Sequence, residues 1–301
     1  MAAVAWVLNL DADLELGAAR GYEPKKNVRL AMQAHGVQLA GALLGAGDVL
    51  VDERAPEGSA AGLLGRAFCP TPRAIALLRR AGADPEPGPA LDILRRVNSR
   101  AFASALGMTL PGAAFVIDLE VARAILRGQP PLGTGWRVKH AFGMAGRNQR
   151  VVVPGALAKR DAAFIEAGLA RGGVQVEPNV VIESEYAIHG LIVEDGSFQL
   201  GAPVRQWCDR NGAWIASERI DPAEALGDHS VREILVALRA EAQHVARALV
   251  GAEFFGPFGV DAYSYRGADG ALCFQPRSDI NARYSMGFAT GFGPPPPTRA
   301  L

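Results

Sequence analysis

An acidic residue interrupts one of the most apolar stretches of the chain, near its C-terminal end. Asp261 lies in the segment FGPFGVDAYSY, whose other residues are typical of a buried β-strand. A buried carboxylate must be paired, hydrogen-bonded or bound to a metal ion. Asp279 and Asn281 lie on the next predicted strand, beyond the turn RGADG, and are the obvious partners. The sequence therefore predicts a hairpin that brings these three side chains together.

The register of this hairpin cannot be regular if the three side chains are to meet. With the tip centred near Ala268, Asp261 lies opposite Gln275 or Pro276, which leaves Asp279 about three residues, or ~10 Å, further along the strand. Pro276 has no N–H group to donate to the ladder, and proline is tolerated mainly at bulges and sheet edges. We therefore expect an irregularity near Pro276.

Polar residues recur at every second position in the segment QPRSDINARYSMG, which runs from Gln275 to Gly287. Side chains two residues apart in a strand point to one face, so Asp279, Asn281 and Arg283 converge. Together with Asp261 they offer two carboxylates and an amide oxygen, which suit Mg²⁺ with its waters and substrate phosphates. The guanidinium of Arg283 suits a phosphate or a carboxylate. The alternative is a polar strand edge that runs into a turn.

Length and charge limit the classes of partner. The chain has 301 residues, which fits two or three lobes, and 31 basic residues balance 31 acidic ones. This neutral balance gives no electrostatic case for nucleic acid or an anionic membrane as partner. We expect a small-molecule partner instead, and a homodimer stays open.

The first apolar run and the cysteines bear on the cellular compartment. The run from Ala2 to Leu10 is too short to span a bilayer and has no basic region before it, so we interpret it as a buried strand. The three cysteines form neither a disulfide framework nor a zinc pattern. Both observations favour a cytoplasmic protein.

Turn-forming segments divide the chain into parts. A β/α alternation of modest strength ends at the segment GADPEPGP. A helix from Leu91 to Leu106 follows it, and the best amphipathic helix of the chain runs from Val231 to Leu249. The predicted parts are a small α/β lobe at 1–90, a central lobe at 91–171, a C-terminal lobe at 172–292 and a flexible or extended tail at 293–301.

Lys139 stands near the end of a predicted strand and is followed by the turn FGMAGRNQ. Gly143 and Gly146 allow backbone N–H groups of this turn to face an anion beside the lysine ammonium, which indicates phosphate binding. The glycines match neither the P-loop nor the dinucleotide-binding fingerprint. An ordinary β-hairpin with an exposed lysine is the alternative.

Two glutamates follow on later strands. Glu177 ends the strand QVEP, and Glu185 lies eight residues further on. A carboxylate at a strand end between two lobes can accept hydrogen bonds from an adenine amino group, and a second carboxylate nearby can hold ribose hydroxyls. Taken alone, the pattern also fits two surface glutamates.

The order of these motifs resembles the ATP-grasp superfamily. A lysine with a glycine turn, a strand-end glutamate, Asp261 and then D-x-N-x-R follow one another between Lys139 and Gly287. The segment VNSRAF is similar to the family's entry helix, in which Arg100 is the nearest match to a nucleotide-binding basic residue and Arg96 is its rival. The resemblance implies an ATP-grasp fold of mixed α/β and α+β class, with two α+β lobes preceded by a small Rossmann-like α/β pre-ATP-grasp domain.

The resemblance also implies ATP and Mg²⁺ as cofactors and a role for each candidate residue. The implied roles are phosphate binding by Lys139 under a mobile flap from Gly143 to Gly146, nucleotide binding by Arg100, adenine binding by Glu177, ribose binding by Glu185, and metal binding by Asp261, Asp279 and Asn281. Family members more often carry glutamate where this chain has Asp279. The shorter arm is expected to weaken or reposition one metal ion.

The activity that the resemblance implies is an ATP-dependent ligase that activates a carboxylate as an acylphosphate and couples it to an amine. Lys139, Arg283 and Mg²⁺ are expected to stabilise the transferring phosphoryl group, because such catalysis rests on positioning and charge. Two alternatives stay open: a phosphotransferase that uses the same nucleotide site, and a nucleotide-binding module without turnover. The sequence does not reveal which small-molecule carboxylate and amine are joined.

Overall fold

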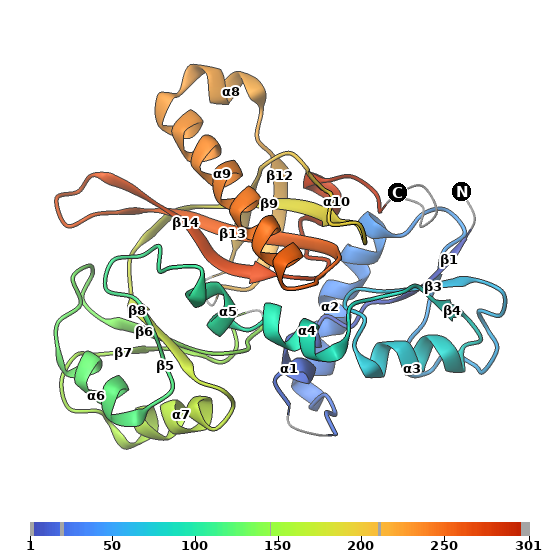
Figure 1. Cartoon of the computed structure of the whole chain (residues 1–301), viewed down its shortest axis with the longest axis horizontal. Helices are drawn as coiled ribbons and strands as arrows, with labels where there is room; N and C mark the ends of the chain where they lie inside the picture. Colours follow the sequence, from blue (N-terminus) through green and yellow to red (C-terminus); the bar gives the residue numbers. More distant parts are fainter. Residues whose placement is uncertain (1–2, 19–20, 145, 210–211, 296–301) are drawn as a thin grey trace.

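The computed structural model describes residues 3–18, 21–144, 146–209 and 212–295. Within these residues the chain forms three β-sheets that follow one another along the sequence, with helices against them (Figure 1). This arrangement agrees with the mixed α/β class expected from the sequence. None of the helices described has the length and apolar character that crossing a bilayer requires. Of the expected tail at 293–301, residues 296–301 lie outside the described residues.

The first sheet is parallel and has the strand order β2-β1-β3-β4. Its strands are β1 (Val4–Val7), β2 (Val49–Leu50), β3 (Leu64–Ala67) and β4 (Asp84–Pro85), and α1 (Ala12–Leu16), α2 (Lys26–Leu43) and α3 (Pro72–Arg80) are the helices of this part. Proline begins α3, where its missing N–H group is tolerated. Leu10 and Phe68 follow the carboxyl ends of β1 and β3 and reach the cavity described below.

The connection to the second sheet consists of two short helices, α4 (Leu91–Val97) and α5 (Arg100–Ala105). The expectation of one continuous helix from Leu91 to Leu106 is therefore wrong. Ser99 interrupts it, because its hydroxyl accepts a hydrogen bond from the N–H group of Ala101 and caps a new helix. This break places Arg100 at the start of α5.

The second sheet is antiparallel and has the strand order β5-β8-β6-β7. Its strands are β5 (Ala114–Val116), β6 (Trp136–His140), β7 (Gln149–Val152) and β8 (Val174–Pro178), and its helices are α6 (Leu119–Arg127) and α7 (Lys159–Leu169). Asp118 caps α6 by accepting hydrogen bonds from the N–H groups of Glu120 and Val121. Lys139 lies on β6, which is fixed because it pairs with a strand on each side.

The third sheet has the strand order β12-β11-β9-β13-β14, with β10 paired to β9. Its strands are β9 (Ile182–Ile192), β10 (Phe198–Leu200), β11 (Val204–Cys208), β12 (Trp214–Arg219), β13 (Gly256–Arg266) and β14 (Leu272–Asn281). The helices of this part are α8 (Pro222–Gly227), α9 (His229–Gly251) and α10 (Phe288–Gly291). The chain leaves the second sheet at Pro178 and enters the third at Ile182, while the domain boundaries themselves stay a prediction.

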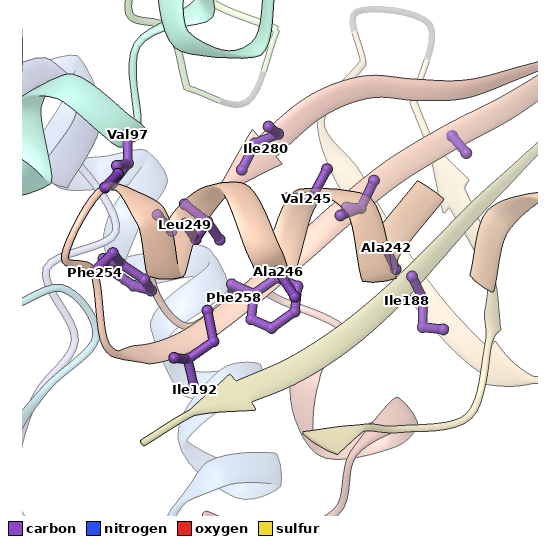
Figure 2. Packing of buried hydrophobic residues seen from close by; sticks show 14 of the residues in the cluster. Val97, Ile188, Ile192, Ala242, Val245, Ala246, Leu249, Phe254, Phe258 and Ile280 are labelled. Carbon is purple, nitrogen blue, oxygen red and sulfur yellow. The ribbon is translucent and has the colours of Figure 1, made fainter. Parts of the chain in front are cut away.

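The long helix α9 packs on one face of the third sheet and contains the amphipathic segment expected from Val231 to Leu249. Figure 2 shows Ala246 of α9 against Phe258 of β13, with Ile280 of β14 above the same helix. Side chains alternate along a strand, so the neighbours of these apolar residues point to the opposite face of the sheet. Polar side chains such as Asp261 and Asp279 lie on that opposite face.

The pairing of β13 with β14 is irregular at one place. Two steps along β13, from Tyr263 to Asp261, correspond to four steps along β14, from Gln275 to Asp279. The irregularity expected near Pro276 is therefore confirmed. It brings the two aspartates directly opposite each other, which a regular ladder would not do.

We expect Leu238→Ala to destabilise the protein by about 2–5 kcal/mol, because Leu238 lies on the face of α9 that is fully buried against the third sheet and its removal leaves a cavity. Urea denaturation followed by circular dichroism measures the free energy of unfolding. Val236→Ala is the control on the same helix, since Val236 is 66% exposed and its loss should change that free energy by less than about 0.5 kcal/mol. Equal losses for both variants would contradict the orientation of α9.

Candidate functional site

One cavity of about 560 Å³ is lined by residues of the second and third sheets. All ten candidate residues from the sequence line it: Arg100, Lys139, Gly143, Gly146, Glu177, Glu185, Asp261, Asp279, Asn281 and Arg283. Leu10, His35 and Phe68 of the N-terminal part line it as well. The structure thus brings the candidates together, and the role of each stays a prediction.

The polar face of the third sheet forms one wall of this cavity. Asp261 of β13 lies opposite Ala187 of β9 and opposite Asp279 of β14. Glu185 of β9 lies opposite Gln206 of β11. Directly opposed residues of an antiparallel pair point to the same face, so strand pairing alone gathers these side chains.

Asp261 accepts two hydrogen bonds from amides. Asn281 Nδ2 donates to one carboxylate oxygen at 2.8 Å, and Gln206 Nε2 donates to the other at 3.0 Å. Burial and the neighbouring carboxylate of Asp279 nevertheless raise the pKa of Asp261 to about 6. The two amides and the nearby Arg283 oppose this rise without cancelling it. Burial and the nearby carboxylate thus disfavour the charge on Asp261, and a cation beside it would favour the ionised form.

Asp279 is held by Arg100. The Nη2 atom of Arg100 lies 2.5 Å from Asp279 Oδ2, and its Nη1 atom donates to the carbonyl oxygen of His140 at 2.8 Å. This ion pair joins α5 to the end of β14. It occupies one oxygen of Asp279, while Asp279 Oδ1 lies 3.2 Å from the N–H group of Ile280.

The donor set of the aspartate pair fits Mg²⁺. Asp261, Asp279 and Asn281 offer two carboxylates and an amide oxygen, and Mg²⁺ completes its octahedron with waters and substrate phosphates. The described residues contain no group of three or more His, Cys, Asp or Glu side chains that could hold a metal ion by themselves. The site therefore suits a cation that arrives with a phosphate ligand better than a permanent structural metal.

Lys139 and Glu177 form a buried ion pair in the second sheet. The distance from Lys139 Nζ to Glu177 Oε1 is 2.6 Å, and Gln175 Nε2 donates to the other oxygen of Glu177 at 2.6 Å. Removing one partner of a buried pair leaves an uncompensated charge. A phosphate that binds Lys139 must therefore compete with Glu177.

The two candidate glycines lie in the turn between β6 and β7. Gly146 has φ +72°, in the left-handed region that favours glycine. A Cβ atom on Gly143 would stand 2.8 Å from the carbonyl oxygen of Arg147 and 3.0 Å from Arg100 Nη1, so a larger residue would displace the arginine. Ala145 lies outside the described residues, and the mobile flap stays a prediction.

Arg283 follows β14 and is bound to Asp13 of α1. Its Nη2 and Nε atoms donate to the two carboxylate oxygens at 2.6 and 3.1 Å, and its guanidinium lies 5.4 Å from the ring centroid of Phe68. Burial opposes the charge, but Asp13 outweighs it and raises the pKa of Arg283. The guanidinium is therefore a fixed cation at the junction of the first and third sheets.

Sequence reasoning missed two polar residues of the cavity. Gln206 carries no local signal, because its contact with Asp261 depends on the pairing of β11 with β9. Ser285 could have been found, since it continues the alternation that starts at Asp279. Its hydroxyl lines the cavity, is buried and has no hydrogen-bond partner within the described part of the chain.

Two further residues of the cavity wall, Arg137 and Cys208, are not among the ten candidates from the sequence. Arg137 lies two residues before Lys139 on β6, and its Nη2 atom donates to Asn179 Oδ1 at 2.7 Å. Burial and the neighbouring Glu185 raise the pKa of the Cys208 thiol. Because a raised pKa keeps it protonated, Cys208 is not placed to act as a nucleophile.

Comparisons with known proteins identify the fold. No protein-family model matches the sequence, and no curated protein sequence matches it. Among solved structures, biotin carboxylase from Campylobacter jejuni as its β-γ-ATP complex matches with a TM-score of 0.55 at 13% identity. The match covers 95% of this chain and 66% of that protein.

Two more solved structures share this architecture. Pyruvate carboxylase from Rhizobium etli with acetyl coenzyme A matches with a TM-score of 0.51 at 14% identity, over 96% of this chain and 27% of that protein. The biotin carboxylase domain of 2-oxoglutarate carboxylase from Hydrogenobacter thermophilus, with MgADP, ADP and bicarbonate, matches with a TM-score of 0.50 at 12% identity. This match covers 94% of this chain and 65% of that protein. The chain therefore spans about two thirds or less of these proteins, and the likeness is one of fold.

We expect the free energy of unfolding of Asp261→Asn, relative to that of the wild type, to be higher at neutral pH than in acid. The pKa of Asp261 is raised from 3.8 to about 6 in the folded state, so the stability that this group contributes is lost as pH rises between these values. The neutral amide avoids that loss, and the difference between variant and wild type should grow by about 1–3 kcal/mol from pH 4 to pH 7.

Thermal denaturation in the presence of EDTA across this pH range measures the effect. Asp92→Asn serves as the control, because Asp92 is exposed on α4. A difference between Asp261→Asn and wild type that stays constant with pH would show that burial and Asp279 do not raise the pKa of Asp261 as described.

Proposed function

We propose that this chain, which has the ATP-grasp fold, is an ATP-dependent ligase that activates a carboxylate as an acylphosphate and couples it to an amine. The convergence of the ten candidate residues on one cavity carries the proposal. A cavity of about 560 Å³ lies in the size range of cofactor sites. Residues 1–90 would form the Rossmann-like pre-ATP-grasp domain, and residues 91–171 and 172–292 would form the two α+β lobes.

ATP would lie between the second and third sheets. Glu177 and Glu185 would accept hydrogen bonds from the adenine amino group and the ribose hydroxyls, respectively. Lys139 and Arg100 would bind phosphate oxygens, below the glycine turn between β6 and β7. Each of these cations is paired with a carboxylate in the cavity, so nucleotide binding exchanges one anionic partner for another.

The metal-binding side chains would be Asp261, Asp279 and Asn281. Bound Mg²⁺ would neutralise charge on the β- and γ-phosphates during transfer. The position of Asp261 directly opposite Asp279, with its pKa raised by burial and by that second carboxylate, supports a cation at this place. Gln206 and Asn281 hold the carboxylate of Asp261 toward the cavity.

The proposed reaction has two steps and needs no side-chain nucleophile. First, an oxygen of the substrate carboxylate bonds to the γ-phosphorus, the bond to the β–γ bridging oxygen breaks, and ADP leaves. Second, the amine nitrogen bonds to the acyl carbon, the bond from that carbon to the phosphate oxygen breaks, and phosphate and a proton leave. Lys139, Arg100 and Arg283 would align the anionic groups and balance their charge.

The N-terminal part would help to bind the substrates. Leu10 and Phe68 line the same cavity, and Asp13 fixes Arg283 at its edge. Ligands of open α/β sheets bind beyond the carboxyl ends of the strands, which is where Leu10 and Phe68 lie. The substrate carboxylate would therefore bind between this edge of the first sheet and the end of β14.

ADP release in the presence of mixed carboxylates and amines, followed by mass spectrometry of the products, tests the activity. We expect release that requires both substrates and yields a new amide. A phosphorylated product without an amide would identify a phosphotransferase instead. Binding of MgATP without turnover over a broad panel would identify a nucleotide-binding module and contradict the proposal.

We expect Asn281→Ala to reduce turnover by at least ~100-fold and to leave the fold intact. Asn281 orients Asp261 and would offer an oxygen to the metal, and it is not a member of the apolar cluster under α9. Steady-state kinetics measure turnover, and circular dichroism checks the fold. Asp269→Ala, in the exposed turn between β13 and β14, should keep full activity. Full activity of Asn281→Ala would contradict the metal assignment.

A further inference from the structure

The bulge in β14 decides which side chain faces Asp261. Tyr263 lies opposite Gln275, and Asp261 lies opposite Asp279, so β14 contains two more residues than a regular ladder would have. If the regular register continued from Gln275, Arg277 would lie opposite Asp261. Asp279 would then lie opposite Gly259, about 7 Å further along the strand.

This regular register would close the proposed metal site. A guanidinium directly opposite Asp261 would form an ion pair with it, as cross-strand opposite charges do. Asp279 would no longer reach the same point as Asp261. The sequence of β14 therefore contains a cation that competes with the metal for Asp261, two residues before the second carboxylate.

The structure directs this cation to the other side of the sheet. The side chain of Arg277 is only 3% exposed and forms an ion pair with Glu241 of α9. Its Nη2 atom donates to the carbonyl oxygen of Gly107, and its own carbonyl oxygen accepts a hydrogen bond from Thr109 Oγ1 at 3.1 Å. Two segments, α9 and the segment from Gly107 to Thr109, thus hold the middle residue of the bulge.

We propose that the Arg277–Glu241 ion pair is a positioning element of the metal site, which fixes the bulge so that Asp279, and not Arg277, faces Asp261. This inference rests on the proposed function. Glu241 acts at a distance, since it does not line the cavity and contacts no candidate ligand. A buried arginine without a carboxylate partner is unfavourable. Loss of Glu241 therefore favours a shift of β14 to the regular register, which would place Arg277 opposite Asp261.

The test compares ADP affinity in excess Mg²⁺ with ADP affinity in EDTA, by isothermal titration calorimetry on the full chain. In Glu241→Gln we expect the Mg²⁺-dependent gain in affinity to fall by about 10-fold, as for other residues that orient metal ligands. The affinity in EDTA should stay unchanged. The double variant Glu241→Gln with Arg277→Met has no arginine that could move opposite Asp261. Its Mg²⁺-dependent gain in ADP affinity should therefore return to that of the wild type.

Two controls make the result specific. Glu233→Gln removes a carboxylate from an exposed pair on the same helix and should change neither affinity. Glu241→Asp keeps a carboxylate on a shorter arm and should give an intermediate loss, which provides the test if Glu241→Gln does not fold. An unchanged Mg²⁺-dependent gain in the Glu241 variants, or an equal loss in Mg²⁺ and in EDTA, would overturn the inference. Wild type without any Mg²⁺-dependent gain would instead contradict the proposed function.

Discussion

The packing of α9 on one face of the third sheet is the constraint on which the candidate site depends. Side chains alternate along each strand, so the apolar residues under α9, such as Ile188, Val260 and Ile280, fix the direction of their neighbours. Those neighbours include the acidic and amide side chains of the cavity. A slip of one residue would bury carboxylates against the apolar cluster under α9, which is unfavourable for a charged group. The core and the polar site therefore depend on the same strand register.

Cations and carboxylates of the cavity largely neutralise each other within the protein. The pairs are Lys139 with Glu177, Arg100 with Asp279 and Arg283 with Asp13. A nucleotide with a divalent cation presents phosphates to the cations of such pairs and a positive charge to the carboxylates. Under the proposed function, binding can thus replace ion pairs without leaving a buried charge alone. Asp261 is different, since its hydrogen-bond partners are the neutral amides of Gln206 and Asn281.

The sequence predicted those features that depend on neighbours along the chain. Strand alternation brought Asp279 and Asn281 to one face, and the missing N–H of Pro276 marked the irregularity in β14. Features that depend on distant pairing were missed. Gln206 meets Asp261 only because β9 lies between β11 and β13, and no local pattern encodes that order. The break before α5 was missed because Ser99 leaves the helical backbone conformation to cap α5, a local change that the apolar pattern of the segment does not encode.

The shorter arm of Asp279, where the family resemblance leads one to expect glutamate, is consistent with the geometry of the hairpin. Directly opposed residues of an antiparallel pair have Cβ atoms about 4.5–5.5 Å apart, so two aspartates at such positions can both reach one cation. The bulge creates this direct opposition. A glutamate at position 279 would have to fold back to reach the point that Asp261 faces. Its longer side chain would instead suit a site one step further along the strand. The register and the length of the arm at position 279 therefore support each other.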